Sequence, residues 1–252
     1  MTCRGLPNPP AAASSRRRAD QNVPIEPIRS KEQPEATAAR LFRDIAVDYE
    51  RWAGILSLGQ DGRWRRLMVG GIRLAPGSLV LDVAAGTGSI SRLLEARGYR
   101  VVAVDLSGEM LTQHSGLHRV RAVADHLPFP EEIFDAVSFG YLLRYVEDPA
   151  DTLREMCRVL RPGGLVGMVE FGRPRGTARL LWRLYTRAVL PLAGAVIGSG
   201  WYRAGRFLGP SIERFHEVHP DLTLSWKEAG LVDVTISRPS LGGGLVMWAR
   251  KP

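Results

Sequence analysis

Four acidic residues in this chain stand where a short apolar run ends, a position from which a carboxylate can hold a ligand. They are Asp82, Asp105, Asp125 and Glu170. Short apolar runs are typical of buried strands, and the carboxyl ends of parallel strands meet at the edge where open α/β sheets bind ligands. Any one of these acids is more simply explained as the end of a strand or the cap of a helix. Together they predict a ligand site at one edge of a parallel sheet.

The stretch 79–91 indicates what that site holds. An apolar run that ends at Asp82 passes through a turn of small residues into apolar residues at helical spacing. This pattern is typical of a first strand, a tight loop and a first helix in a nucleotide-binding domain. Gly86 and Gly88 permit positive φ and leave room for a ligand against the backbone.

Two classes of ligand use such a loop, and Asp82 favours one of them. A dinucleotide site of the form G-x-G-x-x-G would have glycine where this chain has Ser91. A carboxylate just before the loop would repel a pyrophosphate, but it suits the amino group and sulfonium of S-adenosylmethionine. Because a lone G-x-G is a weak signal, this loop by itself leaves any nucleotide fold open.

The elements that position these residues follow in order along the chain. Asp105 ends a second apolar run about 20 residues after the loop, where a ribose-binding carboxylate belongs. Further strands are predicted at 120–124, 134–139, 165–170, 232–237 and 245–250. Residues 158–164 are predicted to close a helix before the fifth strand. The last two strands, joined through Pro239 and 242–244, predict an antiparallel hairpin, which argues against a dehydrogenase.

The fold class predicted is therefore α/β, a Rossmann-like seven-stranded sheet with helices on both faces, an antiparallel C-terminal β-hairpin and a helical lid insertion. At 252 residues with 45% hydrophobic content, the chain can build one domain, predicted at 37–252. Residues 1–36 are rich in Pro and Arg without an apolar period, which predicts a flexible tail. We find no secretory signal pattern there, and no transmembrane run in the sequence.

Cysteine and histidine usage predicts neither a metal site nor redox chemistry. Cys3 and Cys157 have no metal-binding or redox spacing, and Cys157 lies at helical spacing with apolar residues, which predicts a place in the core. The five histidines form no cluster; His216 and His219 lack the H-E-x-x-H spacing of a zinc site. We expect a reducing cytoplasm and no bound metal.

Most of the chain, from about residue 40 to 252, resembles a known family. The matching pieces are 56–66 (LSLGQDGRWRR), 82–88 (DVAAGTG), 146–149 (VEDP), 170–174 (EFGRP), 189–191 (VLP), 211–215 (SIERF), 242–246 (GGGLV) and 250–252 (RKP). On these pieces the chain resembles class I S-adenosylmethionine-dependent methyltransferases, and within them the quinone C-methyltransferases of menaquinone and ubiquinone synthesis. Ala84 is a mild departure, since that position is often glycine in methyltransferases.

The resemblance and the strand ends together assign a site for S-adenosylmethionine. The cofactor-binding residues implied are Asp82, Gly86, Thr87, Gly88, Asp105, Leu106, Met110, Asp125, His126 and Ser138. The first four should surround the methionine moiety and ribose. Asp105 should accept from the ribose hydroxyls, with Leu106 and Met110 beside the adenine. Asp125 and His126 should meet the adenine edge, and Ser138 the methionine end.

Methyl transfer needs little side-chain chemistry beyond alignment in a dry pocket, but a carbon acceptor must lose a hydroquinone proton. The family has S-F-G-L-R-N-V after the fourth strand, and this chain reads SFGYLLRYV at 138–146, two residues longer, with Tyr145 where Asn is expected. We take Arg144 and Tyr145 as the catalytic candidates: the arginine could stabilise an anionic ring oxygen, and Tyr141 or Tyr145 could pass a proton. Arg144 as a surface residue that pairs with Glu147 or Asp148 is the alternative.

Two segments should cover the site. Residues 37–69 are predicted to form two helices across its mouth, and the resemblance places Tyr49 near the methionine end of the cofactor; ordinary packing of Tyr49 and Trp52 is the alternative. Residues 171–220 are predicted to form a helical lid over the substrate, with eight arginines against two glutamates.

Within the second segment, three arginines at 179, 183 and 187 recur every four residues and predict one basic stripe beside apolar residues. Each would cost about 2.5–3.5 kcal/mol at a bilayer centre, so we expect this helix not to span a membrane. On an anionic surface each would contribute about 1 kcal/mol. We expect either a lid that docks on such a membrane or a lid with a solvated basic face. Nucleic acid fits less well, because the arginines come with Leu, Val and Trp.

The function these observations predict is methyl transfer from S-adenosylmethionine to a ring carbon of a prenylated quinol, of the demethylmenaquinol to menaquinol type. The alternative keeps the cofactor and changes the acceptor to another apolar aromatic or polyketide, methylated at carbon or oxygen. A cofactor-binding protein without turnover and a nicotinamide oxidoreductase are the remaining hypotheses. The expected partners are a quinol-like small molecule, the inner face of an anionic membrane, and a second copy in a homodimer. No nucleic acid is expected.

Overall fold

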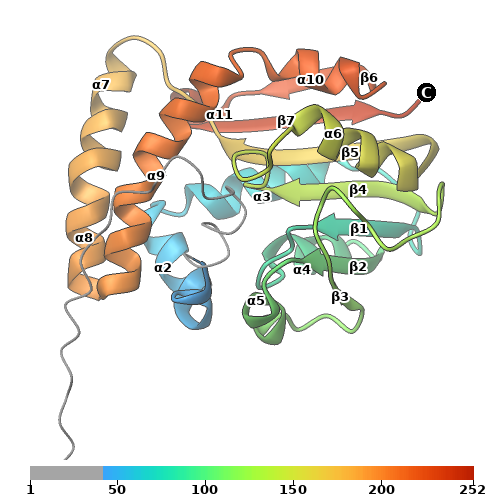
Figure 1. Ribbon diagram of the computed structural model, residues 1–252, viewed down its shortest axis with the longest axis horizontal. Coiled ribbons are helices and arrows are strands. Elements are labelled where there is room, and N and C mark those ends of the chain that lie inside the picture. The colour runs from blue at the N-terminus through green and yellow to red at the C-terminus, as the bar shows by residue number, and fades with distance from the viewer. Residues whose placement is uncertain (1–41) are drawn as a thin grey trace, which may run out of the picture. The chain divides into compact units, whose positions relative to one another are not determined.

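The computed structural model describes residues 42–252 (Figure 1). The predicted tail at 1–36 and the first residues of the predicted domain lie outside the described residues. The helices are a 3₁₀ turn η1 (Ala46–Asp48), α2 (Tyr49–Leu56), α3 (Gln60–Gly71), α4 (Ser89–Glu95), α5 (Gly108–Gln113), α6 (Pro149–Val159), α7 (Thr177–Leu184), a π-helical turn η2 (Tyr185–Val189), α8 (Leu190–Ile197), α9 (Ser199–Val218), α10 (Leu222–Glu228) and α11 (Pro239–Gly242). The strands are β1 (Leu79–Val83), β2 (Arg100–Asp105), β3 (Arg119–Arg121), β4 (Phe134–Gly140), β5 (Leu160–Phe171), β6 (Val232–Ser237) and β7 (Gly244–Arg250).

One seven-stranded sheet carries the fold, in the order β3-β2-β1-β4-β5-β7-β6. The first five strands are parallel, whereas β7 runs antiparallel to both β5 and β6. The strand order reverses between β1 and β4, and such a switch point is where open α/β sheets bind ligands. The predicted Rossmann-like sheet with an antiparallel C-terminal hairpin is confirmed.

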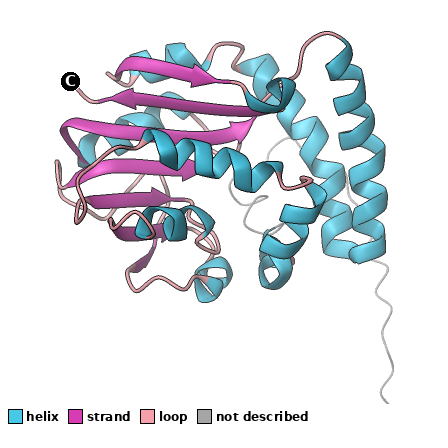
Figure 2. Ribbon diagram, turned by 180° about the vertical axis from the view of Figure 1, so that it is seen from behind, coloured by secondary structure: helices cyan, strands magenta, loops and turns pink. Residues whose placement is uncertain are grey.

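Two apolar cores lie on opposite faces of the sheet, as alternation along the strands requires. On β1, Val80 packs with Trp64 and Met68 of α3 on one face. Leu81 packs on the other face, where Trp226 of α10 is fully buried. Cys157 belongs to this second core, as its spacing predicted. Helices therefore cover both faces of the sheet (Figure 1, Figure 2).

Two strand predictions were wrong in their bounds. The third strand, predicted at 120–124, is Arg119–Arg121, because β2 ends at Asp105, opposite Arg121, and offers no partner beyond it. The fifth strand begins at Leu160 rather than residue 165, so that 160–164 are strand and not the end of a helix. Helix α6 ends at Val159, and the Pro-Gly-Gly stretch that follows lies at a register shift between β4 and β5.

The segment after β5 forms the helical insertion predicted at 171–220. Helices α7 and α8 run against α9, and these three stand beyond the carboxyl ends of β1 and β4, where α2 also lies (Figure 1). The predicted pair of helices across the mouth is only partly right. Helix α2 lies there, but α3 packs on β5 and β7 because it carries apolar residues such as Trp64 and Met68 on one face.

The helical stretch 177–197 is long and apolar enough, by length and composition alone, to cross a membrane. Its charges do not form the single basic stripe predicted from the sequence. Arg179 is 3.1 Å from Glu213 of α9, whereas Arg183 and Arg187 are exposed. The π-helical turn at Tyr185–Val189 also interrupts the regular spacing of four on which that prediction rested.

Candidate active site

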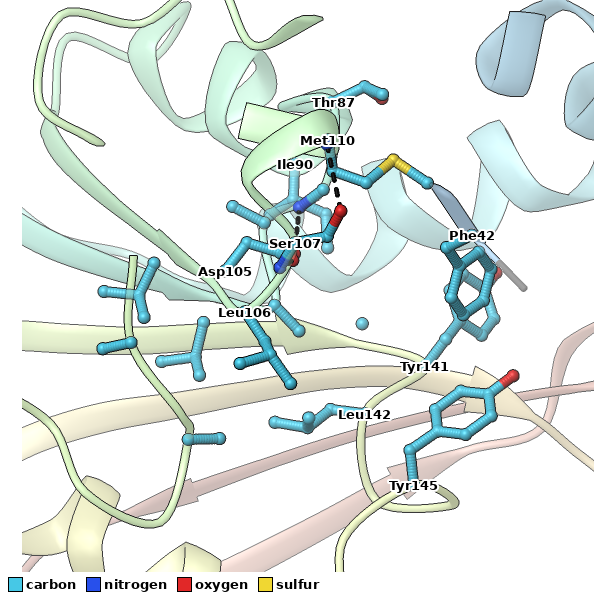
Figure 3. A pocket seen from close by; sticks show the side chains of 18 of the residues that line it. Phe42, Thr87, Ile90, Asp105, Leu106, Ser107, Met110, Tyr141, Leu142 and Tyr145 are labelled. Atoms are coloured by element: carbon cyan, nitrogen blue, oxygen red, sulfur yellow. Dashed lines mark hydrogen bonds between the residues drawn. The ribbon is translucent and has the colours of Figure 1, made fainter. Parts of the chain in front are cut away.

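Two adjoining cavities lie at the carboxyl edge of the sheet, with volumes of about 140 and 370 Å³. The first cavity lies between β1, β2 and the segments that follow them (Figure 3). Of the residues assigned to the cofactor from the sequence, its lining includes Gly86, Thr87, Asp105, Leu106 and Met110. Asp105 and Leu106 lie toward one end of this cavity, and Tyr141 and Tyr145 lie toward the other (Figure 3).

Asp105 fixes the conformation of the loop after β1 by a hydrogen bond. The Gly86 amide donates to Asp105 Oδ2 at 2.8 Å, and the Ser107 amide donates to Oδ1 at 2.8 Å. Burial raises the pKa of Asp105 despite these two donors. Gly86 and Ala84 have φ of 57° and 54°, which glycine adopts freely and alanine at a cost. The positive φ at Ala84 gives a physical reason for glycine at this position in other methyltransferases.

Asp82 and Ser138 lie beneath this loop and do not line either cavity. Both side chains are fully buried, and Asp82 accepts from Ser138 at 2.9 Å and from Ser91 of α4 at 2.5 Å. Desolvation raises the pKa of the Asp82 carboxyl to about 6, against the effect of the two hydroxyl donors. The carboxylate thus ties β1 to β4 and to the start of α4, and so supports the loop from below.

Three other residues assigned to the cofactor also lie off the cavity walls. Asp125 and His126 are exposed and directly follow the lining residue Ala124. Gly88 is the N-cap of α4, with a φ of 88°, and a Cβ there would lie 2.7 Å from the His114 ring. The need for glycine at this position is therefore explained by backbone conformation and packing.

The second cavity is larger and mostly aromatic and aliphatic. It is lined by side chains from α2, α3, α7, α8 and α9, and by the turn at α11. Its apolar lining includes Leu56, Leu58, Trp64, Phe171, Leu181, Trp182, Leu190, Trp201, Phe207, Leu208 and Leu241. Phe42, Tyr49, Tyr141 and Tyr145 line both cavities and form the wall between them. An apolar acceptor in the second cavity would therefore meet a cofactor in the first across these rings.

Arg144 lies at this junction, on the wall of the second cavity. Its Nε is 2.9 Å from Glu170 Oε1, and both side chains are only 1% exposed. Burial opposes the charge on the guanidinium, but Glu170 raises the pKa of Arg144 above its usual value, so the group stays protonated. The alternative of a surface residue that pairs with Glu147 or Asp148 is therefore wrong.

Tyr145 stacks beside this ion pair and faces both cavities. The Arg144 guanidinium lies 4.8 Å from the centre of its ring, and the ring of Phe207 stacks at 6.1 Å. Burial raises the pKa of Tyr145, so its hydroxyl remains a hydrogen-bond donor at neutral pH. The structure thus brings the two catalytic candidates together at the boundary between the cavities.

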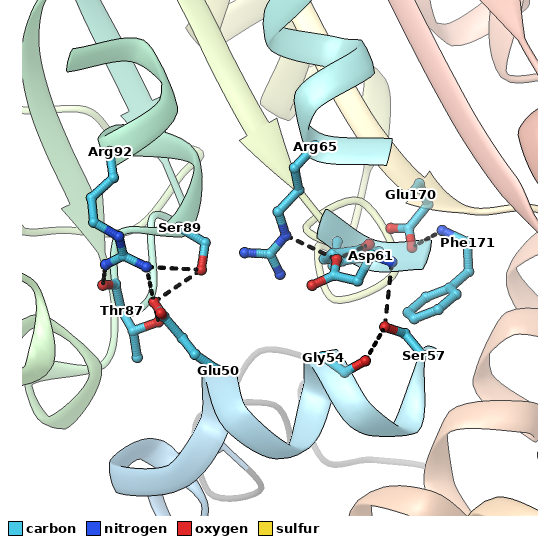
Figure 4. Close-up of polar contacts among 11 residues, drawn as sticks. Glu50, Gly54, Ser57, Asp61, Arg65, Thr87, Ser89, Arg92, Glu170 and Phe171 are labelled. Atoms are coloured by element: carbon cyan, nitrogen blue, oxygen red, sulfur yellow. Dashed lines mark hydrogen bonds and ion pairs between the residues drawn. The ribbon is translucent and has the colours of Figure 1, made fainter. Parts of the chain in front are cut away.

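A polar cluster of Asp61, Arg65 and Tyr141 was missed in reading the sequence. Arg65 Nε donates to Asp61 Oδ1 at 2.8 Å, and the Tyr141 hydroxyl donates to the same oxygen. Arg65 lines the first cavity, with its terminal nitrogens pointing away from Asp61 (Figure 4). Burial opposes its charge, but Asp61 raises the pKa of Arg65. The i, i+4 spacing within 56–66 was the available signal for the pair.

A second missed contact joins α2 to the loop after β1. Glu50 Oε1 accepts from the Thr87 hydroxyl at 2.7 Å and the Ser89 hydroxyl at 2.9 Å, and it pairs with Arg92 (Figure 4). Burial opposes the negative charge, but these three donors lower the pKa of Glu50. Helix α2 is thereby held across the first cavity, where Tyr49 forms part of the wall.

Comparison with known proteins identifies the chain. The model of the ubiE/COQ5 methyltransferase family matches residues 29–250. The chain belongs to this family. Demethylmenaquinone methyltransferase of Renibacterium salmoninarum is 38% identical over 220 residues, which cover 85% of this chain and 90% of that protein. The ubiquinone/menaquinone biosynthesis C-methyltransferase UbiE of Hahella chejuensis is 33% identical over 214 residues, 79% of this chain and 85% of that protein.

Solved structures confirm the fold of this methyltransferase. A possible histamine N-methyltransferase from Thermotoga maritima matches with a TM-score of 0.57 at 18% identity, covering 84% of this chain and 99% of that one. Geranyl diphosphate C-methyltransferase from Streptomyces coelicolor, in complex with S-adenosyl-L-homocysteine, matches with a TM-score of 0.52 at 13% identity, covering 76% and 79%. The methyltransferase uses S-adenosylmethionine as its methyl donor.

Proposed function

We propose that this methyltransferase transfers a methyl group from S-adenosylmethionine to a ring carbon of a prenylated quinol, of the demethylmenaquinol to menaquinol type. One observation carries the acceptor: a large aromatic and aliphatic cavity adjoins the cofactor cavity across a wall of tyrosines. The names of relatives that are 33–38% identical over most of the chain support it. A prenyl tail requires such a cavity because its burial against apolar side chains supplies most of the binding free energy.

The first cavity offers groups that match each part of the cofactor. Asp105 accepts from the ribose hydroxyls, because each of its oxygens has one backbone amide donor and retains a further lone pair. Leu106 and Met110 lie beside the adenine. The terminal nitrogens of Arg65 take the methionine carboxylate, for which the planar guanidinium is suited. Asp82 contributes indirectly, because it lies beneath the loop that carries Gly86 and Thr87 and fixes its position.

The chain's own contribution to the reaction is alignment and charge. The sulfonium supplies an activated methyl group, so the protein has to bring the acceptor carbon into line with it and exclude water. The junction rings of Tyr49, Tyr141 and Tyr145 face the cavity on either side and position the acceptor there. Arg144 stabilises the negative charge on the ring oxygen, since it remains protonated and lines the second cavity.

Incubation with methyl-labelled S-adenosylmethionine and a panel of demethylquinols tests the acceptor. We expect label in the menaquinol or methylated benzoquinol that forms from a prenylated demethylquinol, bound to ring carbon and stable to acid hydrolysis. Naphthols and polyketide phenols without a prenyl tail serve as the comparison set. A protein that binds the cofactor in calorimetry and labels only this comparison set would show that the acceptor is a different aromatic.

We further propose that the outer face of α7 and α8 docks this enzyme on the inner face of an anionic membrane, from the cytoplasmic side. Leu180, Leu184, Leu192 and Val196 are exposed there at 60–90%. Their neighbours Arg183 and Arg187 are exposed cations, which suit acidic headgroups. The cavity mouth supports the same orientation, since its lining residues Leu58, Leu181 and Leu241 are 77%, 69% and 83% exposed.

Vesicle co-sedimentation at low salt tests this docking. We expect the enzyme to pellet with vesicles that contain phosphatidylglycerol and to stay in the supernatant with phosphatidylcholine alone. Each leucine at the interface contributes roughly 1 kcal/mol, so Leu180→Ser/Leu184→Ser should weaken the partition about 10- to 30-fold. Neither residue lines a cavity, so turnover of a short-tailed quinol in detergent should be unchanged.

Leu117→Ser is the matched control, because Leu117 is 90% exposed in the loop before β3. It should pellet like the unchanged protein. The docking proposal is wrong if two results come together: the unchanged protein does not bind vesicles, and it sediments as a dimer that the double variant converts to a monomer. This face would then be the interface between two copies of the chain.

A further inference from the structure

The proposed quinol reaction needs a proton acceptor, and the described residues of the second cavity offer one acidic side chain, Asp61. Glu170 does not line that cavity and is engaged by Arg144. Arg144 stays protonated, so it donates and stabilises charge but accepts no proton. Histidine is absent among the lining residues of both cavities within 42–252. Among the described lining residues, Asp61 is therefore the carboxylate candidate for the base.

The hydrogen bonds of Asp61 leave one of its two oxygens available. Oδ1 accepts from Arg65 Nε and from the Tyr141 hydroxyl, while no hydrogen bond within residues 42–252 uses Oδ2. The Asp61 amide is capped by the Ser57 hydroxyl at 3.3 Å, which fixes the first turn of α3. The side chain is 14% exposed, and the residue lines the second cavity. An oriented carboxylate whose second oxygen has no hydrogen bond within residues 42–252, on the wall of a mostly apolar cavity, is suited to accept a proton.

Tyr141 connects this carboxylate to the point of methyl transfer. It lines both cavities and has a φ of 58°, a left-handed conformation that is costly for a tyrosine. That conformation turns the side chain toward α3, where its ring packs against Phe171 at 4.7 Å and its hydroxyl reaches Asp61. Burial raises the pKa of Tyr141 well above 10, so this hydroxyl remains a donor.

We propose that Asp61 is the general base that takes the proton from the ring hydroxyl of the acceptor, and that Arg65 and Tyr141 hold its carboxylate in place. This inference rests on the proposed quinol function. The ring O–H bond breaks and an O–H bond forms on Asp61 Oδ2. The electron pair on the ring oxygen moves into the ring, whose carbon forms a bond to the methyl group as the bond from methyl to sulfur breaks. The methylated carbon then loses its proton to water, the C–H electron pair restores the aromatic ring and returns charge to the ring oxygen, and Asp61 gives its proton to that oxygen.

Asp61→Asn distinguishes a catalytic base from a residue with a structural role only. The amide keeps the size of the side chain and an oxygen that accepts from Arg65 and Tyr141, but it cannot take a proton from the acceptor. We expect kcat with a demethylquinol to fall about 100-fold or more. The KM for the quinol and the Kd for S-adenosylmethionine, measured by calorimetry, should change less than threefold. Asp151→Asn is the matched control, since Asp151 is an exposed residue of α6 that pairs with Arg154; its kcat should match the unchanged enzyme.

Asp61→Ala provides a second test that a merely structural role would not pass. Formate added to this variant should raise its kcat at least fivefold, because the small carboxylate fits the space left by the side chain. Two results would each contradict the role of Asp61 and leave the proposed function standing. One is an Asp61→Asn enzyme with more than a third of the original kcat, and the other is an Asp61→Ala enzyme that formate does not stimulate. An unchanged enzyme that binds the cofactor but methylates no quinol overturns the proposed function, and the inference with it.

Discussion

Replacing Arg144 by methionine is expected to lower kcat with a demethylquinol by about 10²–10³-fold, as the loss of one preorganised charge donor does in other enzymes. It should also lower the free energy of unfolding by about 3–5 kcal/mol. The stability loss arises because Glu170 would remain buried without its cation; its Oε2 already has no hydrogen-bond partner within the described residues. Denaturant unfolding and steady-state kinetics measure the two effects.

The double variant Arg144→Met/Glu170→Gln separates the effect on stability from the effect on kcat. Removing both charges should restore most of the lost stability, since a buried ion pair replaced by uncharged groups costs little, while kcat stays low. Arg154→Met is the control for removal of an arginine, because its pair with Asp151 is more than half exposed and such pairs contribute less than about 1 kcal/mol. Full recovery of kcat in the double variant would limit Arg144 to a role in folding.

Replacing Asp82 by asparagine is expected to change how stability depends on pH. Desolvation raises the pKa of Asp82 to about 6 from an ordinary 3.8. Because the native state then holds the proton more tightly than the unfolded chain, the stability that Asp82 contributes below pH 3.8 is lost as pH rises through 6. The total is roughly 3 kcal/mol. Asp82→Asn should therefore match the unchanged protein near pH 4 and exceed it by up to that amount at pH 8.

Urea unfolding from pH 4 to 8 measures this difference. Asp151→Asn should show the pH dependence of the unchanged protein, since that carboxyl is exposed. Equal curves for Asp82→Asn and the unchanged protein would contradict the raised pKa. Calorimetry on the same variant tests its second role: as Asp82 supports the loop from below, the Kd for S-adenosylmethionine should rise only a few-fold. A loss of affinity above 30-fold would favour the direct contact predicted from the sequence.

The parts of the site that could be predicted are those encoded in one local pattern. Gly86 and Thr87 follow one strand and Asp105 ends the next, and the apolar runs of both strands are plain in the sequence. The structure places all three residues on the first cavity. Alternation along a strand decides which face a side chain takes, and this is why Asp82 turns under the loop instead of into the cavity. An apolar run in the sequence locates the end of a strand only approximately. It does not tell whether an acidic residue there points into the cavity or beneath the loop.

The remainder depends on contacts between distant segments. Asp61 and Tyr141 are 80 residues apart in sequence and meet only because a left-handed backbone turns the tyrosine toward α3. Arg144 is likewise buried against Glu170 by the packing of the β4 loop on β5, although its neighbours Glu147 and Asp148 suggested a local surface pair. Asp148 instead caps α6, accepting from the Ala150 amide at 2.7 Å.

The attachment of α2 by Glu50 bears on the order in which molecules pass through the enzyme. Glu50 accepts from Thr87 and Ser89, which stand on either side of Gly88 at the end of the loop proposed to lie against the donor. We therefore expect spent donor to leave after those bonds break. The second cavity, proposed for the quinol, has its exposed lining residues elsewhere, at Leu58, Leu181 and Leu241. If the enzyme works at a membrane as proposed, we expect the methylated quinol to leave before the spent donor. Exchange of the donor would then limit the rate of each cycle.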